Sequence, residues 1–162
     1  MGLSRREFLK ISAAIGASFA WAGAARSSQS AWKERRDLYP EGVASGDPGP
    51  DSVILWTRRP FDQGARHVLT VEVAEDQGFR RIVARAPAAV SAAADWTCRV
   101  LAGGLKSARV YWYRFTDAEG NGSRIGRTIT APRPNDRRPV NFAFVSCQSV
   151  NEGKLNAYRR MI

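Results

Sequence analysis

Short apolar runs with a period of two fill the middle of this chain, from residue 38 to residue 131. In one of these runs, for example, Leu69, Val71 and Val73 all fall on the same face. Side chains along a strand alternate between two faces, so this pattern predicts strands that each have a buried face. Turn-forming residues separate the runs roughly every eight to twelve positions, which is the spacing of an all-β sandwich. We therefore predict a mainly β fold for this part of the chain.

A tyrosine motif near the end of this region indicates the type of sandwich. The stretch from Leu105 to Tyr111 resembles the Leu-x5-Tyr corner of immunoglobulin-like and fibronectin type III-like sandwiches. In that corner the tyrosine hydroxyl bonds back to the backbone upstream. The motif predicts an immunoglobulin/fibronectin type III-like β-sandwich over residues 37–132.

An aromatic stripe follows this corner. Tyr111, Tyr113 and Phe115 share one face of a predicted strand, and aromatic residues at this spacing are typical of the core of a sheet. A nucleic-acid-binding surface needs arginines interleaved with exposed aromatic residues, so we expect no nucleic-acid partner. The strand is expected to end in a hairpin loop at residues 117–122, in which Asn121-Gly122 takes positive φ.

The first 25 residues are organised like a secretory signal peptide. A charged start is followed by a weakly apolar stretch rich in Ala, Gly and Ser, and by a small-residue cleavage site at 22–24. The start resembles a twin-arginine export signal, in which the matching residues are Ser4, Arg5, Arg6, Phe8, Leu9 and Lys10. An ordinary basic leader or a short amphipathic anchor is the alternative, and the stretch is too short for a stable membrane span. We expect the twin-arginine export machinery as a partner and a periplasmic or extracellular location.

Two segments of different composition flank the predicted sandwich. Residues 26–36 are rich first in serine and then in charge, which predicts a flexible tether whose Trp32 is free to dock on the domain. Residues 133–139 combine prolines with arginines. Proline cannot continue a sheet, so this second segment predicts a semi-rigid, solvated linker.

The last segment, residues 140–162, begins with a nearly unbroken apolar run from Val140 to Ser146. Such a run predicts a strand buried on both faces, as in α/β sheets. A capping box at 149–152 and helically spaced apolar residues after it predict the start of a helix. We interpret the segment as the first strand and helix start of an α/β domain. In the 162-residue chain alone, we expect it to be poorly ordered or to lie unsatisfied against the sandwich.

Three stretches occur in a specific order behind the leader. They are residues 39–58, with the start Tyr-Pro-Glu-Gly-Val-Ala-Ser-Gly-Asp-Pro, residues 111–115 together with Gly126-Arg127-Thr128, and residues 142–148, Phe-Ala-Phe-Val-Ser-Cys-Gln. Together they resemble the PhoD-type alkaline phosphatases of the bacterial cell envelope. The resemblance implies an N-terminal immunoglobulin-like domain followed by a metallophosphoesterase domain that hydrolyses phosphomonoesters and phosphodiesters, including phospholipids. We therefore expect the N-terminal part of an exported, metal-dependent alkaline phosphatase or phosphodiesterase.

The same resemblance gives Cys147 a role. It implies a catalytic centre with an iron ion, held partly by a cysteine, and calcium ions beside it; Cys147 is the one ligand that can be carried over. No catalytic residue is expected in this chain, so we expect the 162 residues alone to be inactive. From the residues themselves, Cys147 follows a strand at the edge where α/β sheets gather functional groups. A buried inert thiol or a disulfide with Cys98 remain alternatives.

Other chemically capable side chains are better explained by structure. Cys98 lies on an apolar face and is expected to be a small buried group. His67 is the only histidine, so a histidine-rich zinc site is not expected. Asp47 and Asp51 lie in a turn, where capping is their expected role. The arginines of the 133–139 linker are expected to be solvated, although they could steer anionic substrates.

The formal net charge of +10 favours anionic partners in general, which include phosphate esters and anionic lipid head groups. A phosphate-ester substrate of the full-length enzyme fits this charge, and we expect a monomer. The alternative function is a secreted immunoglobulin-like binding or scaffolding module without catalysis. That alternative does not explain the apolar run in 140–162, because a free-standing module needs no further buried strand.

Overall fold

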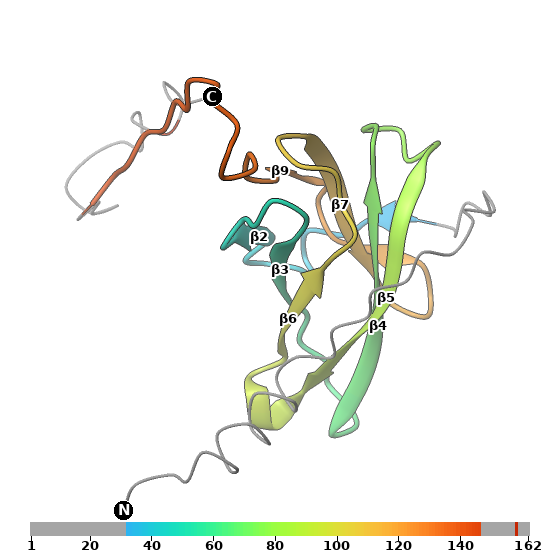
Figure 1. Ribbon diagram of the computed structural model, residues 1–162. Coiled ribbons are helices and arrows are strands. Elements are labelled where there is room, and N and C mark those ends of the chain that lie inside the picture. The colour runs from blue at the N-terminus through green and yellow to red at the C-terminus, as the bar shows by residue number, and fades with distance from the viewer. Residues whose placement is uncertain (1–31, 147–157, 159–162) are drawn as a thin grey trace, which may run out of the picture.

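The computed structural model of the chain describes residues 32–146 and residue 158, and in this part the chain folds into strands joined by turns and one short 3-10 helix (Figure 1). The elements are β1 Lys33–Glu34, β2 Val43–Gly46, β3 Val53–Arg58, β4 Arg66–Ala74, β5 Ile82–Ser91, η1 Ala92–Ala94, β6 Thr97–Ala102, β7 Val110–Thr116, β8 Asn121–Gly122 and β9 Gly126–Ile129. The predicted mainly β fold is confirmed for these residues. None of them belongs to a helix long and apolar enough to cross a membrane.

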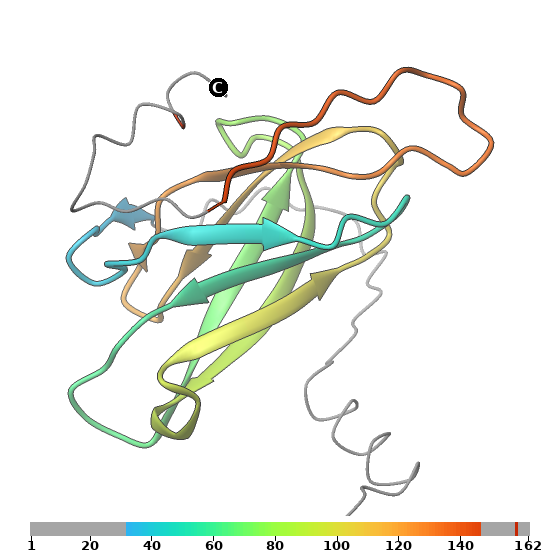
Figure 2. The same ribbon diagram turned by 90° about the vertical axis from the view of Figure 1, so that its left-hand side faces the viewer.

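The strands form two sheets. The larger has the order β1-β8-β7-β4-β5, with β9 also paired to β7, and the smaller has the order β2-β3-β6. Neighbouring strands are antiparallel, except that β1 runs parallel to β8. Figure 2 shows the smaller sheet in front of the larger one. Within the described chain, β2 and β6 each have one unpaired edge.

The hydrophobic core lies between the two sheets because alternate side chains point inward from both. Val53 and Leu55 of β3 are fully buried, while the residues next to them are partly exposed. Tyr111, Tyr113 and Phe115 of β7 are also buried, as the alternation in the sequence predicts. Burial of apolar surface stabilises a fold by roughly 25 cal/mol per Å², so these large side chains dominate the stability of the core.

Tyr111 makes the hydrogen bond that its sequence motif predicts. Its hydroxyl oxygen accepts a hydrogen bond from the backbone N–H of Lys106 at 2.8 Å. The hydroxyl of Thr130 donates to the carbonyl oxygen of Lys106 at 2.6 Å and accepts from the N–H of Arg109 at 3.1 Å. These bonds tie the start of β7 to the chain segment that leaves β9.

The hairpin after β7 turns at a different residue from the one predicted. Gly120 has a φ of +83°, whereas Asn121 and Gly122 form β8 and have no positive φ. The prediction that Asn121-Gly122 takes positive φ is wrong because this dipeptide pairs with β1 as well as with Thr116. Extended backbone is required for both pairings.

The described part of the predicted tether, residues 32–36, is bound to the domain. The N–H of Arg35 donates to the carbonyl oxygen of Gly122 at 2.9 Å, next to the β1–β8 pair. Trp32 docks as expected: its ring centre lies 5.2 Å from the guanidinium carbon of Arg114. Gly122 leaves the space for the indole, because a Cβ there would lie 1.9 Å from the Trp32 Nε1 atom. The described part of this segment is therefore held against the domain by the β1–β8 pairing and by the Trp32 contact.

Residues 140–146 do not form the predicted buried strand. They have no strand assignment, and Val140, Phe142 and Phe144 are 63%, 84% and 85% exposed. A strand buried on both faces needs covering layers and neighbours at both edges, and no described strand pairs with this segment. The finding agrees with the expectation that this segment alone is unsatisfied. The predicted helix start at 149–162 lies outside the described residues, apart from Tyr158.

Candidate functional site

A buried ion pair joins the loops that follow β3 and β7. Arg59 Nη2 lies 3.0 Å from Asp117 Oδ2, and the two side chains are only 10% and 2% exposed. Burial raises the pKa of Asp117, but the hydrogen bonds from Arg59 and Asn121 outweigh this effect, so the pKa lies below its usual value. Asp117 is therefore held as a carboxylate at the end of the sandwich.

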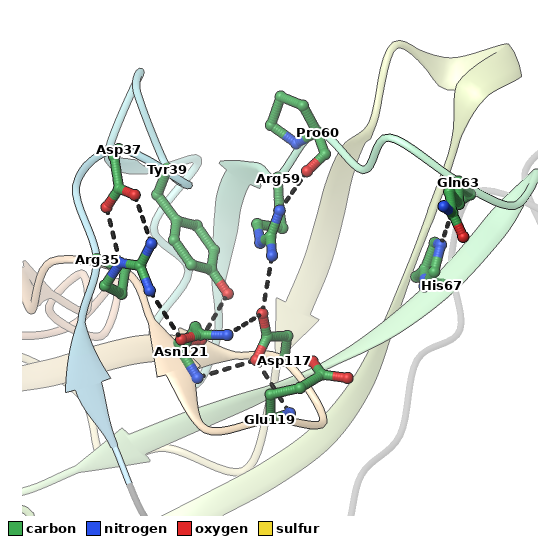
Figure 3. Close-up of polar contacts among 10 residues, drawn as sticks. All are labelled: Arg35, Asp37, Tyr39, Arg59, Pro60, Gln63, His67, Asp117, Glu119 and Asn121. Atoms are coloured by element: carbon green, nitrogen blue, oxygen red, sulfur yellow. Dashed lines mark hydrogen bonds and ion pairs between the residues drawn. The ribbon is translucent and has the colours of Figure 1, made fainter.

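The Asp117 carboxylate also organises the hairpin loop (Figure 3). Its Oδ1 atom accepts hydrogen bonds from the N–H groups of Glu119 at 3.1 Å and Asn121 at 2.9 Å. Its Oδ2 atom accepts from the Asn121 side-chain amide at 3.2 Å as well as from Arg59. The Tyr39 hydroxyl donates to the Asn121 carbonyl oxygen at 3.1 Å. The Asp117 carboxylate thus accepts four hydrogen bonds from protein groups, which fits a structural role.

Aromatic rings continue the cluster from Arg59 to the only histidine. The Arg59 guanidinium lies 4.1 Å from the Phe61 ring centre, and the Phe61 and His67 rings stack at 3.8 Å. His67 Nε2 lies 2.7 Å from the Gln63 carbonyl oxygen, an interaction that Figure 3 also shows. Trp96 packs against both rings at 5.7 and 5.8 Å. His67 thus packs between the rings of Phe61 and Trp96 and bonds to the loop backbone.

A second buried charge cluster lies on the outer face of the larger sheet. Glu72 is 1% exposed, and its carboxylate pairs with Arg114 at 2.7 Å and also with Arg85. The Arg114 guanidinium lies between Trp32 and Phe79, 5.2 and 4.1 Å from their ring centres. Sequence analysis missed this cluster. The available signal was the pair of opposite charges on adjacent strands, but the pairing register that aligns Glu72 with Arg114 is visible only in the fold.

The candidate residues from the sequence divide into two groups. Cys147 and the leader residues Ser4, Arg5, Arg6, Phe8, Leu9 and Lys10 lie outside the described residues. Cys98 is described and is 6% exposed, and burial raises the pKa of its thiol to about 11. It is a free, protonated thiol, as expected for a packed core group. Asp47 and Asp51 lie in the turn region before β3, and Asp47 adopts a φ of +48°.

The described residues do not supply a metal site. No group of three or more His, Cys, Asp and Glu side chains in residues 32–146 has an arrangement that could hold a metal ion. The buried carboxylates of Glu72 and Asp117 are already bound by arginines. The donor set of this part of the chain therefore does not fit the iron and calcium ions that the resemblance implies, and no catalytic step can be assigned to it.

Acid is expected to weaken the Asp117 cluster. Because the folded-state pKa of Asp117 lies below the ordinary 3.8, its contribution to stability is present above about pH 4 and is lost as pH falls toward the folded-state pKa. We expect the free energy of unfolding of wild type to exceed that of Asp117→Asn at neutral pH, and the difference to shrink below about pH 4. Urea denaturation at a series of pH values measures this difference. The exposed Glu119→Gln variant is the control, and a difference for Asp117→Asn that is constant or grows in acid would contradict the account.

The fold and its clusters define a two-sheet β domain in which the buried charges described above pair with one another. The family model described as "PhoD-like phosphatase, N-terminal domain" matches residues 23–132. The chain therefore belongs to this family of PhoD-like phosphatases, which confirms the resemblance inferred from its sequence.

Two relatives show how much of such a protein the chain represents. Alkaline phosphatase D of Bacillus subtilis (strain 168) is 40% identical over 128 residues, which cover 74% of this chain and 22% of the relative. A solved structure described as "Structure of PhoD" matches with a TM-score of 0.72 and 35% identity, over 85% of this chain and 26% of that one. The chain thus spans between 22% and 26% of the length of these relatives.

Proposed function

We propose that this chain is the N-terminal part of an exported, metal-dependent alkaline phosphatase or phosphodiesterase. The observation that carries the proposal is the family match over residues 23–132, supported by the identity to a protein named alkaline phosphatase D. In this proposal residues 37–132 form an immunoglobulin/fibronectin type III-like domain, 133–139 form a linker, and 140–162 begin the phosphatase domain. The Tyr111–Lys106 hydrogen bond and the two-sheet core support the first of these assignments.

In the same proposal Cys147 is one ligand of a metal centre whose other ligands lie in further sequence. Metal-assisted hydrolysis of phosphate esters needs ions held by several ligands, since these ions activate water and stabilise the charge on the leaving oxygen. The described residues act as a scaffold beside that centre. Phosphomonoesters and phosphodiesters, phospholipids among them, are the proposed substrates.

The test of this function compares the 162-residue chain with the product of the complete reading frame that contains it. We expect the complete product to hydrolyse p-nitrophenyl phosphate and bis-p-nitrophenyl phosphate when iron and calcium are supplied. Replacing Cys147 by serine should lower kcat by about a hundredfold, because it removes one metal ligand. A reading frame that ends at Ile162, or a complete product without hydrolytic activity, would favour the scaffolding module instead.

Export by the twin-arginine pathway is a separate part of the proposal. Replacing both Arg5 and Arg6 by lysine keeps the charge of the leader but removes the paired guanidinium groups. We expect this variant to stay in the cytoplasm, while a variant with lysine at Arg26, which lies after the leader, is exported normally. Cell fractionation followed by immunoblotting measures the result. Equal export of both variants would exclude the twin-arginine route.

A further inference from the structure

We propose that one end of the domain holds a phosphate-binding site, formed by Arg81, Lys106 and Arg109 around the buried carboxylate of Glu75. Figure 1 shows the β4–β5 loop, the β6–β7 loop and the start of the linker together at this end. The ligand is an anion that carries a phosphate group, either free in solution or as the head group of a lipid. A benefit to catalysis rests on the proposed function, whose substrates are phosphate esters, whereas the binding itself does not.

Glu75 gathers three cations from two loops. Its side chain is 6% exposed and lies 2.9 Å from Arg81 Nε, 3.7 Å from Lys106 Nζ and 3.3 Å from Arg109 Nη2. Three positive charges thus face one negative charge, and the cluster keeps an excess of positive charge. A carboxylate has about four lone-pair sites, whereas two guanidinium groups and one ammonium group carry about thirteen N–H donors. Glu75 can use only some of these donors, so the others can bind an anion.

The three cations are accessible from solvent although their anchor is buried. The side chains of Arg81, Lys106 and Arg109 are 68%, 64% and 43% exposed. An arginine can bind a phosphate group with two parallel N–H donors, and a lysine adds a compact charge. The cluster therefore combines both kinds of phosphate-binding side chain around one point.

The β6–β7 loop holds Lys106 and Arg109 in a fixed backbone. The Lys106 N–H donates to the Tyr111 hydroxyl oxygen at 2.8 Å, and the Arg109 N–H donates to the Thr130 hydroxyl oxygen at 3.1 Å. The Ala108 N–H donates to the carbonyl oxygen of residue 131 at 3.0 Å. These bonds all use backbone groups of the loop, so the charged side chains take no part in them.

The β4–β5 loop is closed by bonds of the same kind. The Glu75 N–H donates to the Arg81 carbonyl oxygen at 3.0 Å, and the Asp76 carboxylate accepts the Arg81 N–H at 2.8 Å. Both loops are therefore set before any ligand arrives. A site whose groups are already positioned loses less conformational entropy when the ligand binds.

A cavity beside Lys106 gives room for the rest of a ligand. It has a volume of about 460 Å³ and is lined by Pro50, Asp51, Leu105, Lys106, Ser107 and Arg133. This volume is within the range of small-ligand sites. Its two cations, Lys106 and Arg133, exceed its one carboxylate, so the local potential attracts anions. Arg133 is the first residue of the linker, which places the cavity next to the segment that leads to the proposed phosphatase domain.

The charged cluster does not depend on a chain end. Its four residues lie within residues 75–109, inside the two-sheet domain. Covering an excess of positive charge with an apolar surface costs free energy, because the charges lose their hydration. In a longer polypeptide this end should therefore remain in water or meet an anion.

NMR spectroscopy of the isotope-labelled 162-residue chain, titrated with sodium phosphate, tests the binding at each residue. We expect the backbone amide signals of Lys106, Ser107 and Arg109 to shift until the site is saturated. The dissociation constant should be on the order of 10 mM, as for three exposed ion pairs. Sodium chloride at the same ionic strength should not reproduce the shifts, because screening by salt is not specific for phosphate. The signals of the basic leader are separate, so binding there does not obscure the result.

A double variant tests the assigned side chains. Lys106→Gln with Arg109→Gln should raise the dissociation constant about tenfold, measured at the Ser107 amide. Arg81 still pairs with Glu75 in this variant, so no buried carboxylate loses all its partners. Arg66→Gln with Arg99→Gln is the matched control. It also removes two positive charges, from exposed positions of β4 and β6, and should bind phosphate like wild type.

Glycerophosphoglycerol, the soluble head group of phosphatidylglycerol, distinguishes the two sources of the phosphate group. Saturation by this diester at a similar concentration would assign the site to lipid head groups. Saturation by inorganic phosphate alone would assign it to the free anion. Each result supports a phosphate site and selects one source.

Three results would overturn the phosphate site. They are the absence of saturable shifts with both ligands, equal shifts with sodium chloride, and a Lys106→Gln/Arg109→Gln variant that binds like wild type. In the complete product, the same double variant should raise KM for p-nitrophenyl phosphate about threefold with kcat unchanged, because it weakens capture of the substrate. An unchanged KM would overturn the link to catalysis. An inactive complete product would count against the proposed function and leave the NMR result to decide on the site.

Discussion

Replacing Arg114 by methionine should lower the free energy of unfolding by about 3 kcal/mol, because it removes a partner from a buried carboxylate. Glu72 is 1% exposed, and Arg114 contributes two contacts to its Oε2 atom, at 2.7 and 2.8 Å. After the substitution Arg85 would be the remaining ion-pair partner, and its side chain is 39% exposed. The substitution also removes the cation–π contacts of the Arg114 guanidinium with the rings of Trp32 and Phe79.

The matching double variant separates the cost of an unpaired charge from the loss of packing. Glu72→Met with Arg114→Met removes both charges and keeps apolar volume, so it should recover most of the stability lost in the single variant. Urea denaturation followed by tryptophan fluorescence measures all three proteins. A loss of less than about 1 kcal/mol for Arg114→Met would contradict a buried, strongly coupled pair.

Replacing Gly126 by alanine should cost about 2–3 kcal/mol, because the new methyl group overpacks the core. A Cβ at Gly126 would lie 2.3 Å from Tyr113 Cζ and 2.7 Å from its hydroxyl oxygen. Tyr113 is 2% exposed, and its ring packs edge-on against Phe115 at 6.4 Å. The ring therefore cannot move aside without disturbing its neighbours.

Two further variants test whether this contact is the cause. Gly103→Ala is the control, since nothing lies within 4 Å of a Cβ at Gly103, and it should change stability little. Tyr113→Leu shortens the side chain, so adding Gly126→Ala to that background should cost much less than in wild type. Thermal unfolding measures each protein. An equal cost in both backgrounds would show that strand pairing, not the ring, requires glycine.

The strands and the core could be predicted because they follow from patterns among residues that are close in the sequence. Alternation of apolar residues placed Leu69, Val71 and Val73 on a buried face, and the Leu105–Tyr111 motif predicted the Lys106–Tyr111 hydrogen bond. Both patterns depend on neighbours in sequence and on the two-residue period of a strand. The stacking of His67 on Phe61 was not predicted, because the two rings meet through the loop that joins β3 to β4.

The polar clusters could not be predicted because they depend on register and on distant segments. Arg59 and Asp117 are far apart in the sequence and meet only where two loops converge. Trp32 was expected to dock, but the composition of its segment indicated a tether and gave no sign of β1. Residues 140–146 have the composition of a buried strand, yet burial requires partners that local composition does not reveal.

We propose that residues 32–146 form a scaffold and that hydrolysis depends on a metal centre with ligands in further sequence. The most direct test is p-nitrophenyl phosphate hydrolysis by the purified 162-residue chain, with iron and calcium supplied and the complete product measured in parallel. We expect the complete product to turn over and the 162-residue chain not to exceed the protein-free blank. Turnover by the 162-residue chain at a rate comparable to the complete product would contradict it.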